Sequence, residues 1–199
     1  MSIDQLKATI SKKGGLSQAN RFNVMFTPPQ GSLLNSDPAT LIGGLASGGG
    51  LSNIVNDPRD ISLLAESVNL PSSQITTLDH IAEKQSVKIP YAVIQEEVTM
   101  TFLLTNDYYI KNMFDKWGQS IIDLETYRVA YKKDIVTDVV IQQLNKQNIP
   151  IYGVKLENAF PTTIGGVALS NETADTPNKL TVTFSYDKYV VEDGLTSAI

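Results

Sequence analysis

Asp79 and His80 carry the clearest potential for chemistry in this sequence, and His80 is its only histidine. An acid beside an imidazole could form an acid–base pair. Ser-His-Asp catalysis, however, needs a nucleophile positioned against the imidazole in space, and no motif in the sequence supplies one. A polar hairpin tip explains His80 better, so the sequence predicts a protein that is not an enzyme.

Other patterns in the sequence that could bind a ligand do not match a known phosphate, carboxylate-pair or metal motif. The glycine clusters at 43–44 and 48–50 are not followed by the Gly-Lys-Ser/Thr of a phosphate-binding loop, so flexible loop material is the better interpretation. Glu96 and Glu97 are adjacent, so on a strand they point to opposite faces and cannot act as a carboxylate pair. With no cysteine and one histidine, we expect no zinc site and no cofactor.

Composition limits the possible partners. The 199 residues suit one domain, and 42% hydrophobic content is enough for a core. A net charge of −5 argues against a nucleic-acid-binding protein, because phosphate binding needs clustered Lys and Arg. No run approaches the ~20 apolar residues needed to span a bilayer, so no membrane insertion is expected.

A strand near residues 180–186 is the clearest of the elements that would position any site. Side chains alternate across a strand, so this one has two chemically different faces. The apolar face holds Leu180, Val182, Phe184 and Tyr186, and the hydroxyl face holds Thr181, Thr183 and Ser185. The first face needs a core below it, and the second tolerates water or another subunit.

A helix is predicted at residues 107–122, where the apolar period changes to that of a helix. Met113, Phe114 and Trp117 lie on its stripe, together with Ile110 and Ile121. Trp117 is the only tryptophan of the chain. We therefore expect Met113, Phe114 and Trp117 to anchor this helix against a sheet.

The rest of the pattern predicts an antiparallel β scaffold of seven or eight strands. Further expected elements are a short amphipathic helix at 3–12, strands at 21–27, 61–70, 97–104, 135–144 and 149–156, a hairpin at 75–96 with a polar centre, a connection at 159–164, and a Gly-rich loop at 28–60 with a short helix near 38–45. The helix at 3–12 is too short to be stable alone in water, so it must dock on something.

In this order, the segments resemble the tail tube protein family of contractile-tailed, T-even-like bacteriophages, including the related baseplate tube initiators. The resemblance covers nearly the whole chain. Its most specific parts are Asn69-Leu70-Pro71, Asn106-Asp107, Asp115-Lys116-Trp117, Phe160-Pro161-Thr162 with Ile164-Gly165, and the terminal strand with Tyr186 and Tyr189.

The resemblance implies a single tail-tube domain over residues 1–199, with two antiparallel sheets forming a β-barrel or sandwich and one flanking helix. It implies homohexameric rings that stack into the inner tube of a contractile tail, through which phage DNA passes without sequence-specific binding. The implied partners are the tail sheath protein, the baseplate tube initiator and the tail terminator. The implied location is the virion, after assembly in the host cytoplasm. Thr181, Thr183 and Ser185 become candidates for the lumen or for a neighbouring subunit.

Other functions remain open. The Gly-rich insertion at 28–60 departs from the common tube protein and is compatible with a baseplate tube initiator or cap ring. We favour the main tube because the chain is compact and lacks the long C-terminal extension of those baseplate proteins. The tube of a type VI secretion system or of an extracellular contractile injection system is a related alternative. A carbohydrate-binding β domain would need an exposed aromatic platform or paired carboxylates, and the only tryptophan is expected on a helix stripe.

Overall fold

The computed structural model describes residues 2–26, 29, 58–82, 85–170 and 176–192. Within them lie nine strands and four helices. In chain order these are α1 (Ile3–Lys12), β1 (Phe22–Phe26), α3 (Pro58–Leu64), β2 (Ala65–Val68), β3 (Ser73–Ala82), β4 (Gln85–Gln95), β5 (Val98–Leu103), α4 (Tyr109–Ile121), α5 (Lys132–Ile135), β6 (Thr137–Leu144), β7 (Pro150–Ile164), β8 (Lys179–Ser185) and β9 (Lys188–Val191).

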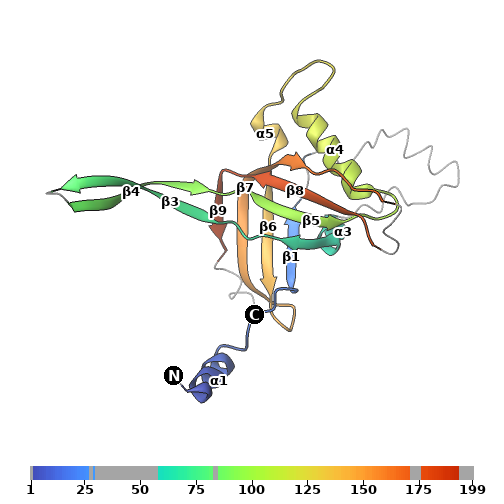
Figure 1. The fold of residues 1–199 in the computed structure, drawn as a ribbon. Helices are drawn as coiled ribbons and strands as arrows, with labels where there is room; N and C mark the ends of the chain where they lie inside the picture. Colours follow the sequence, from blue (N-terminus) through green and yellow to red (C-terminus); the bar gives the residue numbers. More distant parts are fainter. Residues whose placement is uncertain (1, 27–28, 30–57, 83–84, 171–175, 193–199) are drawn as a thin grey trace.

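Seven of the strands form one antiparallel sheet in the order β1-β6-β7-β8-β5-β2, with β9 added on β7. The long strand β7 belongs to both halves of this sheet. Its first part pairs with β6 and β9, and its last part, Phe160–Ile164, pairs with β8. The two halves run in different directions in Figure 1. The remaining strands, β3 and β4, form a separate hairpin. The mainly β, antiparallel fold with a flanking helix is confirmed.

The core lies between the sheet and α4. Leu180, Val182 and Phe184 of β8 are fully buried. The ring of Phe184 lies 5.9 Å from that of Phe114 and 6.0 Å from that of Trp117, measured between centroids. Such edge-to-face pairs add to the free energy gained by burying the rings. The alternating apolar face of β8 therefore packs against α4.

The structure places the three predicted anchor residues Met113, Phe114 and Trp117 in this core, each at most 2% exposed. Phe114 and Trp117 stack with an interplanar angle of 8°. The indole Nε1–H of Trp117 donates to the backbone oxygen of Ile135 at 2.8 Å, which ties α4 to α5. A buried indole N–H needs such an acceptor.

Several predicted boundaries are wrong. Residues 58–64 form α3, so the strand expected at 61–70 is reduced to β2. Residues 159–164, expected to be a connection, are the second half of β7. The hairpin arms extend through the polar segment expected at its centre, because β3 ends at Ala82 and β4 begins at Gln85. The short helix expected near 38–45, and the loop at 28–60 except for Pro29 and 58–60, lie outside the described residues.

Candidate assembly surfaces

The hydroxyl face of β8 continues across the neighbouring strand β5. Thr181 pairs with Thr101 and Thr183 pairs with Thr99 in the antiparallel register. The hydroxyl oxygens of Thr101 and Thr181 lie 3.4 Å apart. Cross-strand threonine pairs of this kind stabilise a sheet while leaving its surface polar and uncharged. The half-sheet β7-β8-β5-β2 thus carries a row of hydroxyls on the side opposite to its core.

Of the three residues predicted for this face, Thr181 is exposed and Thr183 and Ser185 are half-buried. Thr162 of β7 adds a further hydroxyl, which donates to the backbone oxygen of Thr183 at 3.2 Å. At one end of the face, Lys179 forms an ion pair with Glu66 of β2. The structure therefore brings the predicted residues together on one mainly uncharged surface.

The β3–β4 hairpin projects from the body of the molecule (Figure 1). Leu78 and Ile89 are cross-strand partners on one of its faces and are 62% and 46% exposed. Ile75 and Val93 are partners on the other face and are also exposed. A two-stranded hairpin is at best marginally stable in water. Apolar side chains on both of its faces make the hairpin a candidate contact surface for a partner.

The hairpin surface was missed by sequence reasoning. Its signal was present, since apolar residues occupy both alternating sets along β4, at Val87, Ile89, Val93 and Ile94. A strand with one solvent face would show only one apolar set. Both sets indicate burial on both sides, and within the described residues the molecule itself supplies no cover, because all four side chains are exposed.

The segment between α4 and α5 presents a second exposed apolar surface. Its backbone is held by an isolated bridge between Ile122 and Val129 and by the carboxylate of Asp123, which accepts the amide N–H of Glu125 at 2.9 Å. Tyr127 and Tyr131 are 81% and 79% exposed. An ordered loop that holds tyrosines in water is typical of a contact surface.

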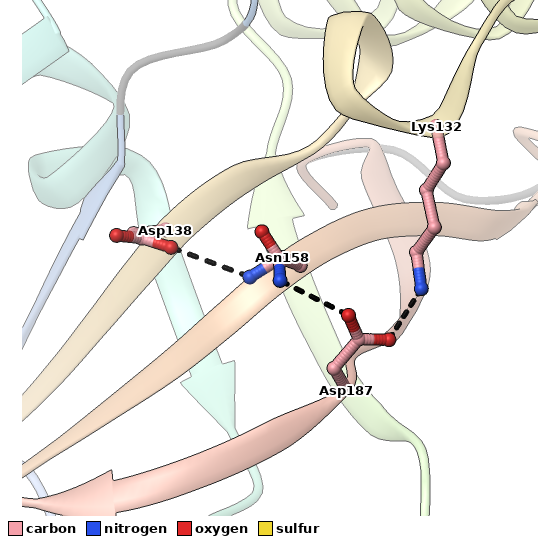
Figure 2. A network of polar contacts seen from close by, with 4 residues as sticks. All are labelled: Lys132, Asp138, Asn158 and Asp187. Atoms are coloured by element: carbon pink, nitrogen blue, oxygen red, sulfur yellow. Dashed lines mark hydrogen bonds and ion pairs between the residues drawn. The ribbon is translucent and has the colours of Figure 1, made fainter.

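The two halves of the sheet meet at a polar joint around Asn158 (Figure 2). The pairing of β6 with β7 slips here, so β7 carries an extra residue, and Asn158 has a left-handed φ of 55°. Its backbone N–H donates to Asp138 at 3.3 Å and its side-chain amide donates to Asp187 at 3.0 Å. Asp187 also binds Lys132. A bulge of this kind bends the strand, and these contacts hold the bend.

We expect Asn158→Ala to destabilise the fold by about 1–3 kcal/mol, because an L side chain without a local polar group is strained at this φ and the hydrogen bond to Asp187 is lost. Asn158→Gly should cost less, since glycine adopts the left-handed conformation freely. Urea unfolding of the two variants beside the parent measures both effects. Equal losses for Ala and Gly would contradict a role for the backbone conformation.

The carboxylates of this joint should make the free energy of unfolding depend on pH. A hydrogen bond from Lys155 lowers the pKa of Asp138, and hydrogen bonds from Lys132 and Asn158 lower the pKa of Asp187. Folding thus favours the ionised carboxylates, and their contribution is present above the unfolded pKa of about 4 and is lost as the pH falls through the lowered folded values. Thermal unfolding should show this acid loss, and Asp138→Asn should show a smaller one. An unchanged pH profile in that variant would contradict the assignment.

The acidic residues and the histidine considered for catalysis do not come together in the part of the chain that the structure describes. Asp79 and His80 are adjacent on β3, so they lie on opposite faces of the exposed hairpin. Glu96 binds the hydroxyl of Ser72, and a carboxylate oxygen of Glu97 lies 3.2 Å from the Thr162 hydroxyl as an alternative acceptor to the Thr183 backbone. Among the residues that the structure describes, no group of three or more His, Cys, Asp and Glu side chains could hold a metal ion, and no helix is long and apolar enough to cross a membrane.

A family model described as phage tail tube protein matches residues 17–192. The chain belongs to the phage tail tube protein family. The match spans every described strand of this tail tube protein and begins after α1. No curated protein matches it in sequence.

Solved structures share the fold of this tail tube protein at low sequence identity. A chain of the sheath–tube complex of the extracellular contractile injection system PVC is 15% identical, with a TM-score of 0.59 over 96% of this chain and 98% of that chain. A chain of the six-fold symmetrised baseplate of the anti-feeding prophage is 14% identical, with a TM-score of 0.58 over 89% and 95%. A chain of the tube-terminating cap of that prophage is 17% identical, with a TM-score of 0.52 over 64% and 79%.

Proposed function

We propose that this tail tube protein is a structural subunit, not an enzyme, and that its copies assemble into stacked hexameric rings that form the inner tube of a contractile phage tail. The apolar hairpin carries this proposal, because its exposed faces need a covering partner and a repeating assembly supplies one in every copy. The tube–sheath and six-fold symmetrised structures that share the fold support the same arrangement.

The hydroxyl face suits the lumen of such a tube. Thr181, Thr183 and Ser185 lie on a sheet whose other side is buried against α4, so this face can line a channel without exposing the core. Its side chains offer no cluster of cations to hold phosphate, and the whole chain is acidic at −5. DNA can therefore pass such a wall during ejection without being held.

The proposed partners lie outside and at the ends of the tube. The exposed segment between α4 and α5 lies next to the helix that covers the opposite side of the sheet from the hydroxyl face, and it offers a surface for a surrounding tail sheath protein. A baseplate tube initiator and a tail terminator would close the two ends. The assembled protein would be part of the virion, after assembly in the host cytoplasm.

Negative-stain microscopy of the purified protein tests the proposal, which predicts rings or tubes at high protein concentration. Monomers alone at high concentration, together with tailed particles that lack the protein in their tubes, would contradict it. A baseplate initiator ring is the second candidate, because a chain of a contractile baseplate shares the fold over 89% of this chain. Copy number per particle separates the two, since an initiator forms one ring and a tube repeats many.

A further inference from the structure

The N-terminal helix α1 has no cover within the described structure. Its start is well defined, because Ser2 and Gln5 form a reciprocal capping box. None of its residues is buried, and Ile3 and Leu6 are 72% and 55% exposed on the stripe that Ile10 continues. A ten-residue helix is marginal in water unless its apolar stripe is packed. In the described part of the single chain, the apolar stripe of α1 therefore has nothing packed against it.

The arm formed by residues 1–21 differs in charge from the rest of the protein. It holds four cations, Lys7, Lys12, Lys13 and Arg21, against the single acid Asp4, which gives a formal charge of +3. Because the whole chain carries −5, the remainder carries −8. A basic amphipathic arm on an acidic body is complementary to the body of another copy.

The linker at residues 13–21 leads α1 away from its own body. Gln143 of β6 donates to the backbone oxygens of Gln18 and Arg21 at 2.7 and 2.8 Å, and Arg21 donates to Asn148 at 2.9 Å. These bonds hold the linker at the turn between β6 and β7. Gly14 and Gly15 then adopt positive φ values and turn the chain outward. Figure 1 shows α1 beyond that end of the sheet.

A groove of matching character lies between β2 and the β1–β6 pair, with a volume of about 540 Å³. Its apolar lining residues are Ala19, Phe22, Val68, Leu70 and Ile141. Ser67, Asn69, Gln142 and Gln143 add polar groups, and the one acid, Glu66, already pairs with Lys179. The groove has room for a row of aliphatic side chains from one helix face. No residue of α1 lines it in the described structure, where Leu70 is 47% exposed.

We propose that α1 of one copy docks in this groove of a second copy, with Ile3, Leu6 and Ile10 against its apolar residues, Leu70 among them, and Lys7 beside the acidic body. This arm exchange rests on the proposed self-assembly and adds a contact to it that is independent of the hairpin. It also accounts for a capped amphipathic helix outside the segment that matches the family model.

The chain has no cysteine, so a disulfide between two introduced cysteines can form only at the chosen positions and tests the docking directly. An affinity-tagged Leu6→Cys chain is mixed with an untagged Leu70→Cys chain under assembly conditions and oxidised. We expect a disulfide-linked heterodimer on a non-reducing gel. The matched control is Lys12→Cys, which lies on the opposite side of α1 and should give little of this product.

Each other outcome overturns the proposal. Equal cross-linking of Lys12→Cys would show random collision. An intramolecular disulfide in the Leu6→Cys/Leu70→Cys double variant, without the heterodimer, would place α1 in its own groove. Rings that form without the disulfide would exclude arm exchange and leave the proposed tube function standing. If neither rings nor the disulfide form, the result would count against arm exchange and against the tube function. Binding of the parent protein, but not of Leu6→Asp, to anionic phospholipid vesicles without any heterodimer would assign α1 to a membrane surface.

Discussion

Phe184→Asp should abolish folding of this tail tube protein. Phe184 is fully buried, and its ring lies among those of Phe26, Phe114 and Trp117. Truncation of a buried Phe costs about 3–5 kcal/mol, and an aspartate placed there adds the cost of burying a charge or of protonating it. Because typical domains are stable by only about 5–15 kcal/mol, the variant should be unfolded or insoluble. Far-UV circular dichroism and solubility of the expressed protein measure the effect.

Thr183→Asp is the matched control for this substitution. It introduces the same side chain one residue away, on the half-buried hydroxyl face. We expect it to fold, because its carboxylate stays in contact with water. A folded Phe184→Asp protein that still forms normal tubes, or a Thr183→Asp protein that fails to fold, would show that the two faces of β8 have been assigned the wrong way round.

Leu78→Asp combined with Ile89→Asp should abolish assembly and leave the fold intact. Both side chains are already exposed in the single chain, so the charges cost little before association. In the assembly the same pair would lie against a neighbour, where two uncompensated carboxylates would oppose contact. Sedimentation and negative-stain microscopy should show the loss of rings or tubes, while the thermal unfolding curve of the monomer stays near that of the parent.

Leu63→Asp controls for the loss of any exposed leucine. Leu63 is 80% exposed on α3, away from the hairpin, so this variant should assemble normally. Normal tubes from the hairpin double variant would contradict the view that the hairpin is an assembly contact. Loss of assembly in both variants would point to a general effect of added negative charge.

The parts of the fold that could be predicted are those in which one apolar period continues without a break. The strict alternation from Leu180 to Phe184 predicted β8, and helical spacing from Ile110 to Trp117 predicted α4. In each case one face is buried in the core, so the pattern and the packing agree.

The predictions failed where local signals compete. The short apolar run at 61–64 fits a helix or a strand, and Pro58 at the first helical position marks the helix that forms. The sequence predicts a connection at 159–164, yet β7 continues through Pro161, because this part of β7 pairs with β8 on one side and the pairing with β6 ends at Ala159. Proline is tolerated on such an edge.

The proposed assembly surfaces would depend on contacts between copies, and the periodicity of one chain does not say which chain provides a contact. The hydroxyl face could be predicted because alternation alone separates Thr181 and Thr183 from the core. The exposure of the hairpin could not, because an apolar strand in a sequence looks the same whether its own chain or a neighbour covers it. Leu78 and Ile89 became informative only when the structure placed them in water.

A cryo-electron microscopy reconstruction of the assembled protein tests the central claim most directly. We predict stacked six-fold rings in which Thr181, Thr183 and Ser185 face a continuous lumen and the β3–β4 hairpin is buried between copies. A reconstruction in which the hydroxyl face lies on the outside of the particle, or in which the hairpin remains in solvent, would contradict it.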